Sequence, residues 1–340
     1  MTPATPQRAA FHQFLEQHGK FLLTTHVNPD GDGLGSEIAL ALWLRSRGKS
    51  VAVLNDSPVP AAFTFLTAEV PIETFEPALA ETRFAEADGL VVLDTSNRQR
   101  IGRLSPLLDG HIIPVAIVDH HVTHQNGFGQ VNVIEPGAAA TGEIVFDLLK
   151  EAGATLTLAM AEALYVALVT DTGSFKYSNT DPAAHRMAAE LLATGIDPQR
   201  LNARVSAHAT AGRLRFFGEA LMGLEMLADG RIAVLDASPE QFAKHGLVGA
   251  DTEGLVDLPR TITGVDVVCL ISEAEAGRIK VSMRSTGRVA IDAVATELGG
   301  GGHPHAAGVL LRGTRAAVRE RVVSRLRALV EAPVTPGPRP

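Results

Sequence analysis

The chain has 340 residues, of which 46% are hydrophobic, and its formal net charge is −8. This length favours two domains over one, and the apolar content is sufficient to fill two cores. No apolar run approaches the ~20 residues of a membrane span, and the first 21 residues lack the apolar stretch of a signal peptide. We therefore expect a cytoplasmic protein without membrane contact.

The charge is distributed unevenly along the chain. Residues 277–327 carry ten Lys or Arg against three Asp or Glu, a net of +7, so the remainder carries −15. This pattern suits a small anionic ligand or a short oligonucleotide better than a long duplex, whose binding depends on many phosphate contacts. Within Thr314–Val330 apolar residues recur at helical spacing, so Arg315, Arg319 and Arg325 are expected on a solvated helix face.

The first half of the chain alternates apolar runs with helical patterns, which is typical of a doubly wound α/β domain with a parallel sheet. Strands are predicted at Phe21–Val27, Val51–Asn55, Leu90–Asp94, Pro114–Asp119 and Gln130–Ile134. Helices are predicted at Ser36–Arg47, Thr141–Ala152, Leu158–Leu168, Pro182–Thr194, Pro198–Ala209 and Ala211–Leu227.

After these helices the sequence changes to short β-like runs separated by Gly and charged turns. The runs are Arg231–Leu235, Val265–Ser272 and Arg278–Met283. We predict an N-terminal domain over residues 1–195, a helical linker over 196–215, a smaller α/β domain over 216–332 and a disordered, proline-rich tail over 333–340. The single cysteine, Cys269, lies in an apolar run and is predicted to be a buried core residue.

Acidic and histidine residues gather directly after three predicted strands, in His26–Asp32, at Asp94 and in Asp119–His121. A parallel α/β sheet builds its site outside the carboxyl ends of its strands, so these residues are expected to converge. Asp171, at the end of a predicted helix, adds another acid. Histidine and carboxylate ligands without cysteine suit Mn²⁺, Mg²⁺ or Zn²⁺, and they outnumber the ligands that one ion uses. A site for a pair of ions indicates an enzyme that hydrolyses phosphoesters.

Several other readings of these segments fail. A calcium loop starting at Asp30 has Leu34 and Ala41 where oxygen ligands belong. The glycine pattern near Asp32 ends in Ser36 instead of the last glycine of a dinucleotide fingerprint. The segment Gly48–Ser50 is not the end of a phosphate-binding loop, because Trp43 stands where the first glycine of that motif is required. Asp94 alone could be a turn residue or a helix N-cap, as Asp at the end of a strand often is. Histidines outside the clusters, and His124, are expected to have structural or solvent-facing roles.

Taken together, the motifs resemble the DHH phosphoesterase superfamily with its DHH-associated C-terminal domain. The resemblance spans roughly residues 15–330 and includes the C-terminal motif Gly299–Gly308. Within the superfamily, the length and two-domain plan resemble the nano-RNase and pAp-phosphatase group, which includes cyclic di-AMP phosphodiesterases. RecJ exonucleases are similar in motif but larger. Family II pyrophosphatases carry an Arg-Lys-Lys signature, whereas this chain has Ser282–Ser285.

The resemblance implies different roles for these side chains in binding metal and in acting on the phosphoryl group. One Mn²⁺ is held by His26, Asp30 and Asp94, and the other by Asp32, Asp94, His120 and Asp171. Asp94 bridges the two ions, and Mg²⁺ or Co²⁺ are conceivable substitutes for Mn²⁺. Asp119 orients a ligating histidine, while His121 protonates the leaving oxygen or binds a non-bridging one.

In the second domain the resemblance implies a nucleotide-binding group. Its members are Arg284, Ser285, Gly301, Gly302 and His303. Glycines let backbone N–H groups approach a phosphate, and arginine can clamp one with two hydrogen bonds. Gly299–Gly302 taken alone would indicate a flexible loop, but their attachment to His303 within the basic segment counts against that interpretation.

Three functions compete. The first is a Mn²⁺-dependent enzyme that releases 5′-mononucleotides from very short oligoribonucleotides and removes the 3′-phosphate of pAp. The second is a cyclic dinucleotide phosphodiesterase with the same metal centre. The third, a non-catalytic nucleotide sensor, is disfavoured because every expected ligand position is filled. The preferred substrate and the oligomeric state, including a homodimer, stay open.

Overall fold

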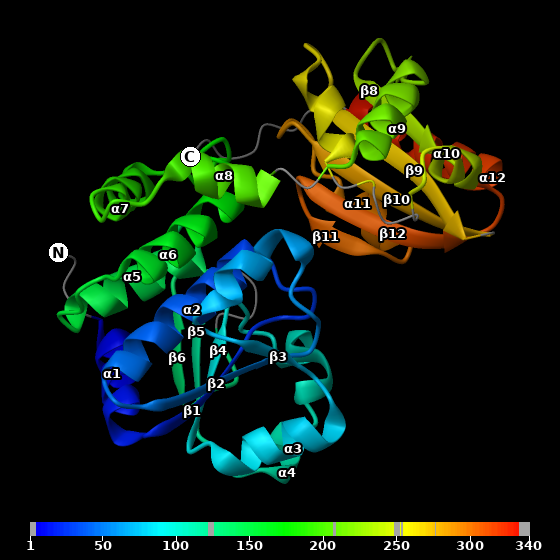
Figure 1. Cartoon of the computed structure of the whole chain (residues 1–340). Helices are drawn as coiled ribbons and strands as arrows, with labels where there is room; N and C mark the ends of the chain where they lie inside the picture. The colour runs from blue at the N-terminus through cyan, green and yellow to red at the C-terminus, as the bar shows by residue number, and fades with distance from the viewer. Residues whose placement is uncertain are drawn as a thin grey trace. The chain divides into compact units, whose positions relative to one another are not determined.

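The computed structural model describes residues 5–121, 126–206, 209–247, 252, 254–275 and 277–332 (Figure 1). The predicted tail, 333–340, and His124 lie outside these residues. The chain divides into two compact units, residues 1–208 and 209–340. The predicted linker, 196–215, is shared between them: helix α8 (Pro198–Ser206) belongs to the first unit and helix α9 (Ala211–Met222) to the second.

The first unit contains a six-stranded parallel sheet in the order β3-β2-β1-β4-β5-β6. The strands are β1 (Lys20–Thr24), β2 (Ser50–Asn55), β3 (Ile72–Thr74), β4 (Gly89–Leu93), β5 (Val115–Asp119) and β6 (Val131–Ile134). This order is doubly wound, as predicted, and it reverses between the neighbouring strands β1 and β4. A crevice for a ligand forms at the carboxyl ends of strands at such a reversal.

Helices cover both faces of this sheet. They are α1 (Pro6–Gln17), α2 (Gly31–Ser46), α3 (Pro77–Glu86), α4 (Leu107–Gly110), α5 (Thr141–Glu151), α6 (Leu158–Asp171) and α7 (Pro182–Leu192), with the 3₁₀ turns η1 (Ala61–Ala68) and η2 (Arg98–Leu104). Alternate strand residues such as Leu23 and Val91 pack with α2, α5 and α6, while Leu22 and Leu90 pack with α3 and η2. Burial on both faces explains the continuous apolar strand sequences.

Helix α2 begins at Gly31, five residues before the predicted start at Ser36. The Asp30 carboxylate accepts hydrogen bonds from the backbone amides of Asp32 and Gly33, at 3.0 and 3.1 Å, and so caps the helix. The cap and the packing against α6 outweigh the low helix propensity of the glycines in this segment. The cap places Asp30 and Asp32 at the sheet edge where β1 ends.

The second unit contains a mixed six-stranded sheet in the order β11-β12-β10-β9-β8-β7, in which β8 and β9 are parallel and the other neighbours antiparallel. The strands are β7 (Glu225–Leu227), β8 (Ile232–Ala237), β9 (Val267–Glu275), β10 (Arg278–Ser285), β11 (Gly301–His303) and β12 (Ala306–Arg312). Helices α11 (Asp292–Glu297) and α12 (Arg315–Glu331) pack on one face; α9, α10 (Pro239–Lys244) and η3 (Leu255–Thr261) pack on the other. The predicted α/β class is confirmed for both units.

One prediction about this unit needs correction. The helix predicted over Ala211–Leu227 ends at Met222, and Glu225–Leu227 form the edge strand β7 because they pair with β8. Gly301–His303 pair with β12 as the opposite edge strand, an element that was not predicted. Cys269 is fully buried in β9, where burial raises the pKa of its thiol to about 12. Among the described residues, no helix has both the length and the apolarity to cross a membrane.

Candidate metal centre

The histidines and acids of the first unit meet at the carboxyl ends of β1, β4 and β5. His26 follows β1 and Asp94 follows β4, so they lie at the reversal of strand order. His120 and His121 follow the last residue of β5, Asp119. The remaining acids come from helix ends: Asp30 and Asp32 from the N-terminus of α2, and Asp171 from the C-terminus of α6. The structure therefore brings together all eight predicted residues of this site.

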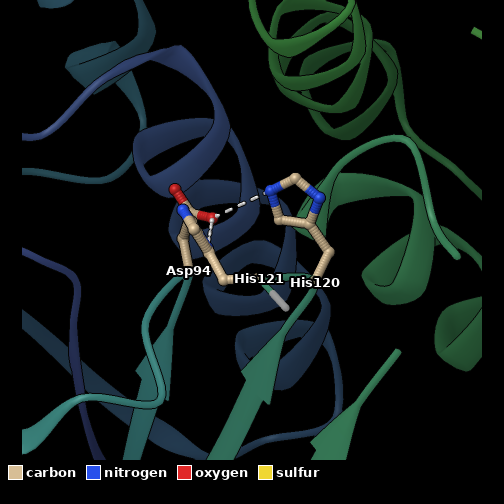
Figure 2. Close-up of side chains that lie close together, drawn as sticks. All are labelled: Asp94, His120 and His121. Atoms are coloured by element: carbon tan, nitrogen blue, oxygen red, sulfur yellow. Dashed lines mark ion pairs between the residues drawn. The ribbon is translucent and has the colours of Figure 1, made fainter. Parts of the chain in front are cut away.

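Asp94 is at the centre of the cluster. One carboxylate oxygen, Oδ2, lies 3.3 Å from His26 Nε2, while the other, Oδ1, lies 3.7 Å from His120 Nε2 and 3.7 Å from His121 Nδ1. Figure 2 shows the two neighbouring histidines facing this carboxylate. Asp94 has a φ of 62°, in the left-handed region that few non-glycine residues adopt. The two oxygens thus face two different sets of side chains.

The first set consists of His26, Asp30 and Asp94, each of which offers a ligand atom within 4.8 Å of the others. His26 Nδ1 is 2.8 Å from the carbonyl oxygen of Val27, which leaves Nε2 directed at the acids. A hydrogen bond of this kind fixes the ring and the tautomer of a metal-ligating histidine.

The second set consists of Asp32, His120 and Asp171, also within 4.8 Å. His120 Nδ1 lies 3.2 Å from the carbonyl oxygen of Ala138, so its Nε2 likewise points into the cluster. The first set is the one that the resemblance implied, whereas the implied second set also included Asp94. A third group within the same distance joins Asp94 to His120 and His121. The assignment of ions to these residues stays a prediction.

Electrostatics show that the cluster has an excess of negative charge. Burial, together with the neighbouring Asp94 and Asp171, raises the pKa of Asp32 well above its usual value. Burial also raises the pKa of Asp171 to about 6, although His120 opposes this. Burial disfavours a charged His26, but the adjacent acids outweigh it and raise its pKa to about 10. Crowded carboxylates and inward-facing Nε2 atoms form a donor set that fits divalent cations.

Asp119 and His121 form a pair beside these two sets. His121 Nδ1 lies 2.8 Å from Asp119 Oδ1, and the backbone amide of His121 also donates to that oxygen. Burial opposes ionisation of Asp119, but hydrogen bonds from His121 and Ser96 hold its pKa below its usual value. The ionised carboxylate fixes the ring of His121 and not that of His26 or His120, the two predicted ligands, so the predicted role of Asp119 toward a ligating histidine is corrected. The other nitrogen of His121, Nε2, is 3.5 Å from Arg100 Nη1.

Sequence reasoning missed three residues that contact the cluster. Thr141 Oγ1 donates to Asp94 Oδ1 at 2.9 Å, and the Asn179 side-chain amide donates to the backbone oxygen and Oδ2 of Asp171. Arg100 reaches His121 from η2. Only Thr141 had a sequence signal, as the first residue of a predicted helix, where free amides attract carboxylates.

The predicted residues of the second unit lie around β10 and β11. Arg284 is partly exposed, with Nε 3.5 Å from Asp257 Oδ1. Ser285 is buried, and its hydroxyl donates to the carbonyl oxygen of Val289 and accepts from the amide of Gly287, so it stabilises a turn. Gly301 and Gly302 are exposed in β11, and His303 is the last residue of that strand. A substrate-binding role for these residues stays a prediction.

The basic helix α12 forms ion pairs within its own unit. Arg319 lies 2.7 Å from Glu225, Arg325 lies 2.8 Å from Glu297 and Arg315 lies 3.9 Å from Asp236. Neighbouring acids therefore compensate much of the positive charge that the sequence concentrates here.

Comparisons with known proteins agree with this organisation. The family model for the DHH family, N-terminal domain, matches residues 20–168, and the DHHA1 domain model matches residues 231–332. The bifunctional oligoribonuclease and PAP phosphatase NrnA of Thermus thermophilus is 32% identical over 297 residues, covering 87% of this chain and 85% of that protein. The protein of the same name from Bacillus subtilis is 26% identical over 300 residues, covering 86% and 90%.

Solved structures show the same fold. An exopolyphosphatase-related protein from Bacteroides fragilis superposes with a TM-score of 0.89 at 27% identity, covering 96% of this chain and 97% of that one. RecJ from Thermus thermophilus in complex with Mn²⁺ gives 0.52 at 18% identity, covering 96% and 55%. This chain belongs to the DHH family, in the group with a DHHA1 domain that includes the bifunctional oligoribonucleases and PAP phosphatases.

Proposed function

We propose that this chain is a metal-dependent phosphoesterase that hydrolyses very short oligoribonucleotides to 5′-mononucleotides and removes the 3′-phosphate of pAp. The names of its relatives support these substrates. The observation that carries the chemistry is the position of Asp94, whose two oxygens face two separate sets of candidate ligands. A carboxylate in this position suits a pair of ions and is not needed for a single one.

We assign two Mn²⁺ to this centre. His26, Asp30 and Asp94 would hold one ion, and Asp32, Asp94, His120 and Asp171 would hold the other. Paired divalent ions supply Lewis-acid activation of a phosphoryl group and a water nucleophile near neutral pH. The chain's contribution is to fix the donors, because Thr141 holds Asp94 while Val27 and Ala138 orient the two histidine rings.

His121 is assigned to the phosphoryl group. Its Nδ1 is held by Asp119, so the ring is oriented and Nε2, whose contact with Arg100 Nη1 is 3.5 Å long, is available to act toward an oxygen of the substrate. Nε2 either protonates the leaving oxygen or binds a non-bridging one, and in both roles an ionised Asp119 stabilises the positive charge on the ring.

The second unit is assigned to nucleotide recognition. Arg284 is partly exposed at the end of β10, and the exposed glycines of β11 leave backbone groups accessible at a sheet edge. A guanidinium and free amides are the donors that bind phosphate oxygens. Gly301, Gly302 and His303 are included in this assignment, while Ser285 supports it through the turn that it stabilises.

Parallel turnover assays test the proposal. The protein with Mn²⁺ is supplied with pAp, a diribonucleotide, cyclic di-AMP or pyrophosphate, and the products are separated by chromatography. We expect turnover of the first two, with loss of activity in chelator. Preferred hydrolysis of cyclic di-AMP would replace the proposal by the cyclic dinucleotide alternative, and binding without hydrolysis of any substrate would indicate a sensor.

A variant of the central carboxylate tests the two-ion assignment. Asp94→Asn removes the negative charge that both sets share, so activity should fall by more than the ~10–100-fold typical of residues that only support a ligand. The control is Asp109→Asn, because Asp109 is exposed and its ion pair is with Arg98, away from the candidate ligands. Full activity of Asp94→Asn at saturating Mn²⁺ would contradict the assignment.

A further inference from the structure

Three arginines lie within six residues of η2, directly after the strand that ends before Asp94. Arg98 is 2.6 Å from Asp109, and Arg103 is 2.8 Å from Asp56. Arg100, between them, has no carboxylate of the described residues within 4.0 Å. Among the described residues, acids therefore neutralise two of these three positive charges and leave the third, that of Arg100, without one.

The unneutralised guanidinium is directed at the candidate site. Its Nη1 is 3.5 Å from His121 Nε2, on the side of the ring away from the Asp119 hydrogen bond. This separation is at the upper limit for a hydrogen bond, so the contact with His121 uses little of the bonding capacity of the guanidinium. An arginine has five N–H donors in a planar fork.

The backbone holds Arg100 in place independently of its side chain. The carbonyl oxygen of Arg100 accepts a hydrogen bond from the amide of Val27 at 2.7 Å, and its own amide donates to Asn97. Since Val27 follows His26, this bond joins the loop after β1 to the loop after β4. Side-chain variants of Arg100 keep this connection.

We propose that Arg100 is a substrate-contacting residue that clamps the phosphoryl group next to His121, an inference that rests on the proposed phosphoesterase function. A partly buried guanidinium that meets no carboxylate within the described part of the chain is suited to an anion that arrives with the ligand. Phosphate oxygens match its fork, because two parallel N–H donors can bind two of them. The arginine and the histidine then contact different oxygens of the same phosphoryl group.

The first test measures phosphate binding directly. Inorganic phosphate is titrated by calorimetry into the Mn²⁺-loaded wild type, Arg100→Ala, Arg100→Lys and the control Arg98→Ala. Losing a charge-assisted hydrogen bond should weaken phosphate binding by about 10- to 100-fold in Arg100→Ala. Arg100→Lys should be intermediate because it keeps the charge but not the fork, and Arg98→Ala should match the wild type.

The second test separates a clamp from a role in the metal centre or in the ring position of His121. Mn²⁺ affinity and stoichiometry of Arg100→Ala, measured by calorimetry, should equal those of the wild type, while kcat/KM on pAp falls by about 100-fold. Weakened Mn²⁺ binding, or reduced turnover with unchanged phosphate affinity, would overturn the proposal. If the wild type hydrolyses none of the substrates, the proposed function fails, and phosphate binding still decides the role of Arg100.

Discussion

The carboxylate of Asp32, in the first turn of α2, accepts a 2.8 Å hydrogen bond from the backbone amide of Gly142, in the first turn of α5. Its other oxygen accepts from the amide of Thr141 at 2.7 Å. Two helices more than 100 residues apart in sequence therefore start at the same carboxylate, and the free amides of α5 stabilise its charge. Both oxygens of Asp32 are thus fixed by hydrogen bonds from the protein itself.

Gly142→Ala should weaken the contact between the first turn of α5 and the carboxylate of Asp32. A Cβ at Gly142 would stand 2.5 Å from Cβ of Ala167 in α6, so α5 and α6 must shift apart, and we expect this shift to disturb the amides of α5 that hold Asp32. Overpacking of this kind costs about 1–3 kcal/mol, more than alanine gains in helix propensity. We expect a lower free energy of unfolding in urea and weaker Mn²⁺ binding. Gly137→Ala, in open space before α5, is the control, and equal stability of the two variants would contradict this account.

Substitutions of the neighbouring residues His120 and His121 should affect different properties, metal binding in the first case and turnover in the second. His120 Nε2 lies among Asp32, Asp94 and Asp171, so His120→Ala should lose bound Mn²⁺ together with activity. His121→Ala should retain Mn²⁺ and lose about 100- to 10,000-fold in kcat, the usual contribution of a general acid or base. Metal analysis of the purified variants with parallel kinetics checks both, and loss of Mn²⁺ from His121→Ala would make His121 a ligand.

Much of this site follows from a simple rule about parallel sheets. The apolar runs ending before His26, Asp94 and His120 are buried on both faces, so their carboxyl ends had to meet at one edge. The order of strands placed His26 and Asp94 on neighbouring strands, and local sequence carries no information about that order. The contacts of Asp32 with α5 and of Arg100 with His121 likewise depend on distances that only the folded chain defines.

The predicted and observed secondary structure differ at α2 and β7, where tertiary contacts act against the local sequence preference. Helix α2 starts within a glycine-rich segment because Asp30 caps it and α6 packs against it. Strand β7 follows a helical pattern directly, and pairing with β8 decides its conformation. In each case tertiary contacts outweigh a weak local preference.

Substitutions of the adjacent β10 residues Arg284 and Ser285 should affect different properties, substrate affinity in the first case and thermal stability in the second. Arg284→Ala should raise KM for pAp more than it lowers kcat, because a lost phosphate contact removes binding that substrate and transition state share. Ser285→Ala should chiefly lower the melting temperature, since its buried hydroxyl satisfies two backbone groups, a loss of about 1–3 kcal/mol. Steady-state kinetics and thermal unfolding of both variants check this. An unchanged KM in Arg284→Ala would remove it from the nucleotide site.

Glu37 should make the stability of the metal-free protein depend on pH. It is fully buried in α2, and burial raises its pKa from 4.5 to about 8, although a hydrogen bond from Asn55 opposes this. The folded chain therefore binds a proton that the unfolded chain releases between pH 4.5 and 8. The contribution of Glu37 to the free energy of unfolding is fully present below this window. It falls by up to ~1.4 kcal/mol per pH unit as the pH rises through the window, and it does not change further above it.

The variant Glu37→Gln isolates this contribution. It is nearly isosteric but does not titrate, so urea unfolding in chelator should give a shallower fall in stability between pH 5 and pH 8 than in the wild type. Glu16→Gln, at an exposed position of α1, should keep the wild-type slope. Parallel pH profiles of wild type and Glu37→Gln would show that Glu37 is ionised in the folded chain.

The last prediction concerns substrate length. Long RNA needs an extended basic surface or a track of aromatic side chains, yet aromatic residues make up 5% of this chain and the net charge is −8. The positive segment lies in the second unit, where acids such as Glu225 and Glu297 already pair with its arginines. We expect kcat/KM to fall steeply from dinucleotides to oligomers of about ten nucleotides, well beyond the smallest single-strand sites of ~4 nucleotides. A time course on end-labelled oligoribonucleotides of graded length measures this, and equal or faster degradation of the long ones would favour a processive exonuclease.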